Sequence, residues 1–309
     1  MYRKKITIYL SLIILSIIVL NILHYSEIKK CEKKFPNKNI NVAIDESLKI
    51  PEVKKENYIP KIIYRVCNTK EYLDKFKKPI DMTQEVMKGY ELKIYFDQDI
   101  IDFIKENYPE DVLYLFNKIN PEYYPSKVDL FRYLLIYKKG GIYLDAKSVI
   151  KENIDPLIQK YGDKLFAVKG KWYKNYLNLI DNFYIKNLLN YNQNWSYFSG
   201  TPYGEYNNWI IISPAGNPIL KQVILQTLSN IKYGLANNNY IHGEISVLAM
   251  TGPLMYTRVI TEHKDKEDYK LFNSRIDNKV AYSIFNHKKL LGDKHYKKIK
   301  NKKILIDNY

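Results

Sequence analysis

Three charged residues in the middle of the chain have the types and spacing of a binding site. Asp129 and Arg132 are three positions apart, which places them on one face of a helix. Asp145 comes at the end of a short apolar run, Ile142–Leu144. Carboxylates are ligands of divalent ions, and a guanidinium is a charge-assisted partner for anions. Taken singly, Asp145 is also explained as a turn or cap residue. Asp129 with Arg132 is also explained as a surface ion pair worth under about 1 kcal/mol.

The elements around these residues predict a fold that carries them to the edge of a sheet. Ser126–Tyr137 has a helical pattern with Ser126 as its cap, Gly140 and Gly141 stop the helix, and the strand Ile142–Leu144 follows. Strands are also predicted at Ile59–Val66, Tyr90–Phe96, Leu165–Val168, Trp209–Ser213 and Ala281–Phe285, and helices at Lys77–Lys88, Asp97–Asn107, Glu110–Ile119, Pro218–Ile231 and Pro253–Glu262. This alternation indicates an α/β fold with a mostly parallel central sheet. Because ligands of such sheets bind beyond the carboxyl ends of the strands, Asp145 is placed where a ligand would lie.

The stretch from 126 to 145 resembles a known signature, S-x-x-D-x-x-R-x-x-x-L-x-x-x-G-G-x-Y-x-D. Its fixed positions are occupied by Ser126, Asp129, Arg132, Gly140, Gly141, Tyr143 and Asp145, with Ile136 in place of the Leu. The signature is that of glycosyltransferases with the sugar-binding region containing the DXD motif. These are glycosyltransferase family 32 and its relatives, which include the glucosylating domains of large clostridial toxins.

The resemblance extends over about residues 59–290. The opening IPKIIYRVCN is similar to the family's first strand, with Tyr64 where His is usual and Arg65 where Gln is usual. Later matches are Gly89-Tyr90-Glu91 followed by Asp97 and Asp99, the segment Asn208–Pro218, and Thr251-Gly252-Pro253.

The resemblance implies a GT-A fold and transfer of a sugar from a nucleotide-sugar donor to a glycan, lipid or protein acceptor, with retention at the anomeric carbon. It implies catalytic roles for Asp129, Arg132 and Asp145. The donor contacts that it implies are Asp129, Arg132, Tyr143 and Asp145. Lys147 and His287 are further candidates for donor binding, and His287 is also explained as a structural polar residue. A Mn²⁺ or Mg²⁺ ion would be held by Asp145 and His287. Such a reaction releases a nucleoside diphosphate, whose developing negative charge a metal or cations must stabilise.

The DXD motif itself departs from the family pattern. It reads Asp145-Ala146-Lys147, so an ammonium replaces the second carboxylate. A nearby ammonium disfavours binding of a divalent ion. Three outcomes are open: Asp145 holds the metal with other ligands, Lys147 acts as the cation on the diphosphate, or the protein is a catalytically silent binding protein on a GT-A scaffold.

Two further regions offer candidate contacts. Near the carboxyl end, Asn286-His287-Lys288-Lys289 and His295 lie in or beside a segment, 288–303, with eight Lys and one Asp. This segment is either a lid over the diphosphate, a contact with anionic lipid, or a solvated basic tail. An aromatic cluster is either a carbohydrate-stacking wall or core, and it consists of Trp172, Tyr173, Tyr176, Phe183 and Tyr184.

The amino end predicts a membrane anchor. Ile6–Leu23 is an uncharged apolar run, preceded within residues 1–5 by Arg3, Lys4 and Lys5 and followed by no A-x-A cleavage pattern. We expect an uncleaved single-pass signal anchor, a stem at 24–58 and a glycosyltransferase domain at 59–309. Lys residues flank the anchor on both sides, so the orientation stays open, although analogy with type II relatives favours a lumenal or extracytoplasmic domain.

Composition excludes several classes of protein. Of 309 residues, 46% are hydrophobic, which excludes a disordered chain, and two cysteines exclude a disulfide scaffold. Cys31 and Cys67 are compatible with either a disulfide or two thiols. The net charge of +16 suggests an anionic partner, but no nucleic-acid-binding motif accompanies it, so no nucleic-acid partner is expected.

Overall fold

The computed structural model describes part of the chain in detail. The described residues are 42–170, 205–236, 243–272, 276, 278–284 and 302–306. They lie in the compact unit Asn41–Tyr309. Within the described residues no helix is both long and apolar enough to span a bilayer. The predicted anchor, Ile6–Leu23, lies outside them.

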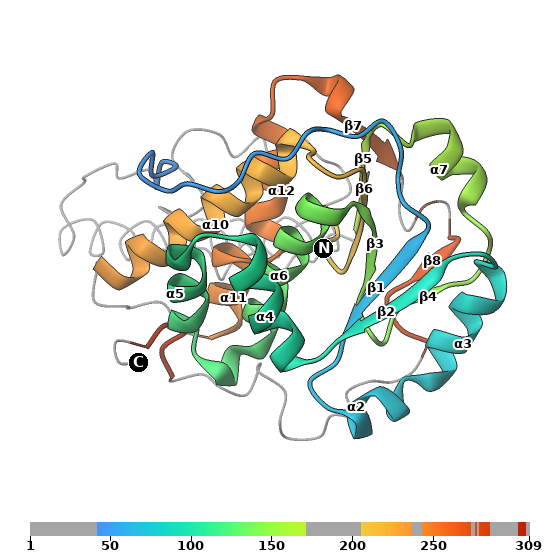
Figure 1. Ribbon diagram of the computed structural model, residues 1–309, viewed down its shortest axis with the longest axis horizontal. Helices are drawn as coiled ribbons and strands as arrows, with labels where there is room; N and C mark the ends of the chain where they lie inside the picture. Colours follow the sequence, from blue (N-terminus) through green and yellow to red (C-terminus); the bar gives the residue numbers. More distant parts are fainter. Residues whose placement is uncertain are drawn as a thin grey trace, which may run out of the picture. The chain divides into compact units, whose positions relative to one another are not determined.

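A four-stranded sheet forms the centre of the fold (Figure 1). Its strands are β1 (Ile62–Val66), β2 (Glu91–Tyr95), β3 (Gly141–Leu144) and β6 (Ile210–Ser213), in the order β2-β1-β3-β6. β1 pairs in parallel with both β2 and β3, and β6 runs antiparallel to β3. The prediction of an α/β fold with a mostly parallel sheet is thereby confirmed. The carboxyl ends of β1, β2 and β3 meet at one edge, which is the edge that Asp145 follows.

Alternate residues of the strands face two different layers. On one face, residues such as Tyr64, Tyr143 and Ile211 join a core formed with the large helices. On the other face, Ile63 and Ile142 join a smaller core formed with α7 and the short strands. Because both faces are covered, β3 and β6 have nearly continuous apolar sequences, whereas the edge strand β2 alternates and exposes Glu91 and Lys93.

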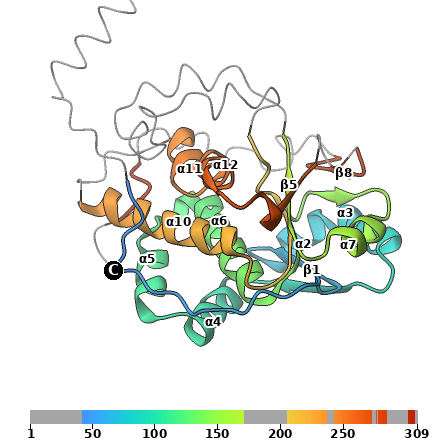
Figure 2. The same cartoon turned by 90° about the horizontal axis from the view of Figure 1, so that it is seen from above.

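The large helices cover one face of the sheet, and α3 and α7 lie on the other side (Figure 1). The bounds are α2 Lys70–Lys75, α3 Lys77–Val86, α4 Asp97–Asn107, α5 Glu110–Lys118, α6 Tyr124–Lys139, α7 Asp155–Tyr161, α10 Pro218–Ala236, α11 Glu244–Met250 and α12 Pro253–Glu262, with 3₁₀ turns η1 at Pro121–Tyr123 and η3 at Lys266–Asp268. Figure 2 shows α6 and α10 between α11 and α12 on one side and α4 and α5 on the other. Two small sheets pair β4 (Val149–Ile150) with β8 (Val280–Ala281) and β5 (Leu165–Val168) with β7 (Tyr269–Phe272).

Helix α6 carries the signature residues and is buried on nearly all sides. Its run from Leu130 to Tyr137 is almost completely shielded from solvent, Arg132 included. The prediction that Ser126 caps this helix is wrong. The helix begins at Tyr124, because Pro125 is accommodated in its first turn, and Ser126 lies inside the helix with its hydroxyl buried and without a hydrogen bond.

Two glycines allow α6 to pass directly into β3. Gly140 and Gly141 have φ values of 65° and 104°, which residues with a side chain rarely adopt. A Cβ on Gly140 would lie 2.7 Å from the backbone nitrogen of Ala215, and one on Gly141 would lie 2.9 Å from the Tyr64 ring. Both positions therefore need glycine, and this tight connection fixes the distance between Arg132 and Asp145.

Residues 42–58, which we had assigned to the stem, pack against the folded unit. Val42, Leu48 and Ile50 are buried in its main core, and the backbone N–H of Glu56 donates to the carbonyl of Ala215. Apolar side chains at these positions are stabilised by burial, which a stem would not provide. The start of the folded unit therefore moves from residue 59 to about residue 41.

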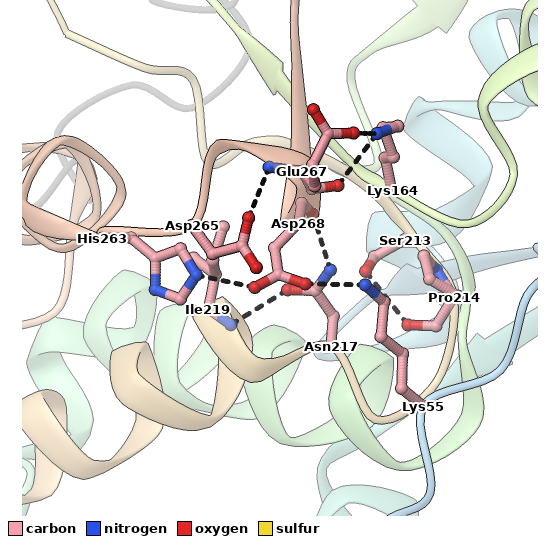
Figure 3. Close-up of polar contacts among 10 residues, drawn as sticks. All are labelled: Lys55, Lys164, Ser213, Pro214, Asn217, Ile219, His263, Asp265, Glu267 and Asp268. Carbon is pink, nitrogen blue, oxygen red and sulfur yellow. Dashed lines mark hydrogen bonds and ion pairs between the residues drawn. The ribbon is translucent and has the colours of Figure 1, made fainter.

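A polar cluster fastens this segment to residues 217–268 of the folded unit (Figure 3). Asp268 receives Lys55 Nζ at 2.6 Å and His263 Nε2 at 2.8 Å on its two carboxylate oxygens. Its backbone carbonyl accepts from the Asn217 side chain at 2.9 Å. Burial alone raises the pKa of Asp268, but the hydrogen bonds from Lys55 and His263 outweigh it, and the pKa is lowered. The cluster thus joins three segments that are distant in sequence, around Lys55, Asn217 and 263–268.

Candidate functional site

Asp129 and Arg132 form a buried ion pair inside α6. Arg132 Nη1 lies 3.1 Å from Asp129 Oδ1, and the two residues are only 4% and 5% exposed. The carboxylate of Asp129 also accepts from Asn208 Nδ2 and from Thr251 Oγ1, each at 3.0 Å. Burial, opposed by the neighbouring guanidinium, raises the pKa of Asp129 to about 6. Asp129 and Arg132 therefore form a buried ion pair, and the alternative of a surface ion pair does not apply.

Arg132 links this pair to Asp145. Its Nη2 lies 3.1 Å from Asp145 Oδ1, and its Nη1 donates to the carbonyl of Asn208 at 2.7 Å. The guanidinium lies over the Tyr143 ring at 4.6 Å, and the Tyr143 hydroxyl donates to Asp145 Oδ1 at 2.9 Å. Burial alone lowers the pKa of Arg132, but Tyr143 and the two carboxylates outweigh it and raise the pKa. Arg132 is thus a fixed cation between two carboxylates.

Asp145 brings this network to the edge of the sheet. It follows the last residue of β3, and its side chain is 18% exposed, whereas that of Arg132 is 5% exposed. Its backbone N–H donates to the carbonyl of Trp209, and its carbonyl accepts from the N–H of Ser148, which closes a turn over 145–148. Of the signature carboxylates, Asp145 is therefore the one that a ligand reaches first.

Lys147 lies within the same turn, against an aromatic ring. Its ammonium is 4.1 Å from the centre of the Tyr282 ring, a cation–π contact. The Tyr282 ring also packs on Trp209 at 5.4 Å, and the carbonyl of Tyr282 accepts from Ser148 Oγ. Burial lowers the pKa of Lys147, and Asp145 opposes this shift. A second cation therefore lies beside Asp145 in place of the second carboxylate of the motif.

The described residues do not suit a divalent metal ion. No group of three His, Cys, Asp or Glu that could hold one occurs among them. The carboxylate of Asp145 is engaged by Arg132 and Tyr143, both oxygens of Asp129 accept hydrogen bonds, and an ammonium stands at position 147. Mn²⁺ and Mg²⁺ need several oxygen ligands with compensating negative charge, which this set lacks. The second metal ligand that the resemblance implies, His287, lies outside the described residues.

The structure brings most of the predicted site residues together. Asp129, Arg132, Tyr143 and Asp145 form one network, with Lys147 in the adjoining turn. Asp97 and Asp99 are instead engaged at the start of α4, where Asp97 accepts from the Tyr124 hydroxyl and Asp99 Oδ2 accepts from the N–H of Phe96. His295, the aromatic cluster 172–184 and Cys31 lie outside the described residues, and Cys67 is buried with a free thiol whose pKa burial raises to about 11.

Sequence reasoning missed four members of the site. Asn208 and Thr251 hold Asp129, Arg65 holds the turn, and Tyr282 holds Lys147. The first three stand in segments already recognised as similar to the family. Their roles depend on contacts across 79, 122 and 80 positions, which no local pattern indicates.

The resemblance read from the sequence is confirmed by comparison with known families. Residues 25–163 match the family described as glycosyltransferase sugar-binding region containing DXD motif. This segment includes β1, β2, α6, β3 and the turn, and hence Asp129, Arg132, Tyr143, Asp145 and Lys147.

Curated relatives are similar over part of the chain. Inositol phosphoceramide mannosyltransferase 3 of Schizosaccharomyces pombe is 31% identical over 100 residues, which is 32% of this chain and 27% of that protein. Mannosyl phosphorylinositol ceramide synthase SUR1 of Saccharomyces cerevisiae is 27% identical over 118 residues, 38% of this chain and 30% of that protein. The matched part thus spans less than a third of either relative's length.

Among solved structures, PaToxG glycosyltransferase is 17% identical with a TM-score of 0.42, over 78% of this chain and 80% of that one. The UDP-bound glycosyltransferase domain from the YGT toxin is 11% identical with a TM-score of 0.32, over 72% of this chain and 59% of that one. Both likenesses are distant.

Proposed function

We propose that this protein is a glycosyltransferase with a GT-A-like fold that transfers a sugar from a nucleotide-sugar donor. The observation that carries the proposal is the Arg132 guanidinium fixed between Asp129 and Asp145 at the carboxyl edge of the sheet. Such an arrangement costs free energy in a purely structural role, because three charges are buried or half-buried together. Its location in the segment that matches the glycosyltransferase family supports the assignment.

The mechanism follows from the charges that the turn presents. Asp145 is an acceptor for hydroxyl groups of the donor, and Arg132 and Tyr143 hold its carboxylate in one orientation. Lys147 is the more accessible cation, and moving it from the Tyr282 ring onto the diphosphate forms a charge-assisted contact. As the bond from the sugar to the diphosphate breaks, the negative charge that develops on the leaving group lies near Lys147 and Arg132. We include retention at the anomeric carbon in the proposal, on the basis of the family resemblance.

For the donor sugar and the acceptor, the names of the relatives are the guide. Because two of them are named for mannosyl transfer involving inositol phosphoceramide, we propose mannose as the first donor sugar to test. The acceptor class would be a lipid with a phosphoinositol head group. An excess of Lys and Arg, with a net charge of +16, suits an anionic acceptor at a membrane surface.

The test is release of a nucleoside diphosphate. The protein from residue 41 onward is incubated with UDP- and GDP-sugars, with and without Mn²⁺, and with phosphoinositol lipid in detergent. Turnover with one donor supports the enzyme. Binding of a donor without turnover, under every acceptor and metal condition, would instead favour the catalytically silent scaffold.

We also propose that the chain is anchored by Ile6–Leu23 as a single-pass protein, with a lumenal or extracytoplasmic catalytic domain. The full-length protein is expected to stay in the membrane fraction after carbonate extraction, because about 18 apolar residues span the hydrocarbon core. The same chain starting at residue 41 should be in the supernatant. Release of the full-length chain by carbonate contradicts the anchor.

Lys147 provides a prediction about metal dependence. Replacing Lys147 by Ala should weaken donor binding about tenfold to a hundredfold, because a charge-assisted contact is lost. Replacing it by Asp restores the common motif and should make turnover more dependent on Mn²⁺. Donor affinity and Mn²⁺ titrations check both, with Lys151→Ala as a control because Lys151 is exposed and follows β4. If Lys147→Ala and Lys147→Asp both show the donor affinity and the Mn²⁺ dependence of the wild-type chain, Lys147 has no part in donor binding.

A further inference from the structure

Arg65 is completely buried in β1 and reaches the turn that follows β3. Its Nη1 lies 3.0 Å from each of three backbone carbonyl oxygens, those of Asp145, Ala146 and Ser148. The other nitrogen, Nη2, donates to Thr83 Oγ1 at 3.0 Å. Because one Nη carries two hydrogens, the three carbonyls share them and converge on a single point. The backbone of the turn is thus wrapped around a guanidinium.

Packing of β1 within the fold does not by itself require a charged side chain at position 65. Its hydrogen-bond partners are carbonyls and a hydroxyl, and among the described residues it forms no ion pair with a carboxylate. A buried cation without a paired anion is unfavourable relative to an apolar side chain. Burial lowers the pKa of Arg65 to about 10, which leaves it charged at neutral pH. A positive charge retained at such a cost points to a requirement of the turn that it holds.

Thr83 extends the same support to the strand after the turn. Its hydroxyl donates to the carbonyl of Pro79 at 2.8 Å and accepts from Arg65 and from the N–H of Ile150. One end of the turn is therefore held by β3 and β6, and the other by α3 through Thr83 and Arg65. Without the guanidinium, the carbonyls of Ala146 and Ser148 would lose this donor and that of Asp145 would keep only the N–H of Ser148, so the turn would have to open toward water.

We propose that Arg65 is a positioning residue of the donor site, which fixes the 145–148 turn so that Asp145 and Lys147 are both directed toward the donor. The inference rests on the proposed function in one respect, namely that the turn receives a nucleotide-sugar. The geometry of the clamp is independent of the reaction. It also explains how a chain with Lys in place of the second carboxylate keeps its motif in a defined shape.

The experiment compares Arg65→Gln and Arg65→Lys in the full-length chain. By native-state hydrogen exchange, the amide of Ser148 should exchange about tenfold faster or more in Arg65→Gln, while the amides of Ile142–Leu144 keep their wild-type rates. Lysine keeps the charge and three donors but loses Thr83, so Arg65→Lys should lie between wild type and Arg65→Gln. Thr83→Val, which keeps the shape of the side chain, should show the same change more weakly. Wild-type exchange at Ser148 in Arg65→Gln overturns the proposal.

Donor-affinity measurements on double variants distinguish a positioning role of Arg65 from a general effect on stability. In the Arg65→Gln background, Lys147→Ala should lose most of its effect on donor affinity, because Lys147 is then already misdirected. Arg258→Lys serves as the control, since Arg258 is equally buried but lies in α12, and there Lys147→Ala should keep its full effect. Additive effects of Arg65→Gln and Lys147→Ala contradict the positioning role. Should the wild-type chain turn over no nucleotide-sugar, the proposed function fails, and hydrogen exchange still decides whether Arg65 holds the turn.

Discussion

Replacing Arg132 by Ala is expected to cost about 3–5 kcal/mol of the free energy of unfolding at about pH 8, together with most of the donor turnover. The reason is that Asp129 would stay buried without its cation. Asn208 and Thr251 would still donate to its carboxylate, but they carry no charge. The measurement is urea-induced unfolding of the chain from residue 41 onward, followed by circular dichroism.

The loss should depend on pH in a definite direction. In the wild-type chain the folded-state pKa of Asp129 is already raised to about 6, above its unfolded value near 4. Without Arg132, burial raises it further, so the folded state binds a proton that the unfolded state does not. Stability should then fall as pH rises toward the new folded-state pKa, by up to about 1.4 kcal/mol per pH unit, whereas the wild-type contribution of Asp129 levels off above about pH 6.

A second buried arginine provides the control for this experiment. Arg258 is 3% exposed and pairs with Glu262, but the side chain of Glu262 is 33% exposed. Water can therefore hydrate Glu262 when Arg258 is removed, and Arg258→Ala should lose stability by an amount that changes little with pH. If Arg132→Ala lowers the free energy of unfolding by the same amount at every pH, Arg132 does not stabilise the charged form of Asp129.

Local patterns predicted the secondary structure well because burial and turn chemistry agree along most of this chain. Leu165–Val168 and Pro253–Glu262 are observed with the predicted bounds. The helix start at Ser126 was misplaced, because a Ser preceding an apolar run favours a cap, whereas Pro125 already occupies the first turn. Residues 42–58 were misassigned because their charges are conspicuous, while the core into which Val42, Leu48 and Ile50 pack is formed by residues that are distant in sequence.

The sequence predicts which residues form the candidate site, but it does not predict the contacts that hold them in place. The spacing of Asp129, Arg132 and Asp145 around a double glycine is local information, and the structure brings these three side chains together. That Asp129 faces the interior depends on Asn208 and Thr251, whose segments reach it only through the packing of β6 and α11 beside α6. A polar residue whose hydrogen bonds all go to other protein groups looks the same in the sequence as a polar residue that binds a ligand.

Replacing Asp145 by Asn should reduce donor turnover by about a hundredfold to a thousandfold, with a change in unfolding free energy below about 1 kcal/mol. Asn keeps the size of the side chain but removes the charge that Arg132 and Lys147 face. Because the buried Arg132 stays paired with Asp129, the neutral replacement leaves no buried charge unpaired. Initial rates of nucleoside diphosphate release and urea unfolding check the two parts of this expectation.

Asp155 offers a closely matched control for Asp145, at the opposite edge of the sheet. Its side chain is 17% exposed against 18% for Asp145, it accepts from the Tyr90 hydroxyl as Asp145 does from Tyr143, and it pairs with Lys61 as Asp145 does with Arg132. Asp155→Asn should therefore lose an ion pair, although with the more exposed Lys61, and a tyrosine contact while keeping wild-type turnover. If the two variants lose turnover equally, the effect comes from weakened packing of the sheet. If only Asp145→Asn loses turnover, the carboxyl edge is the place of the chemistry, because losing a tyrosine contact and an ion pair at the other edge does not remove turnover.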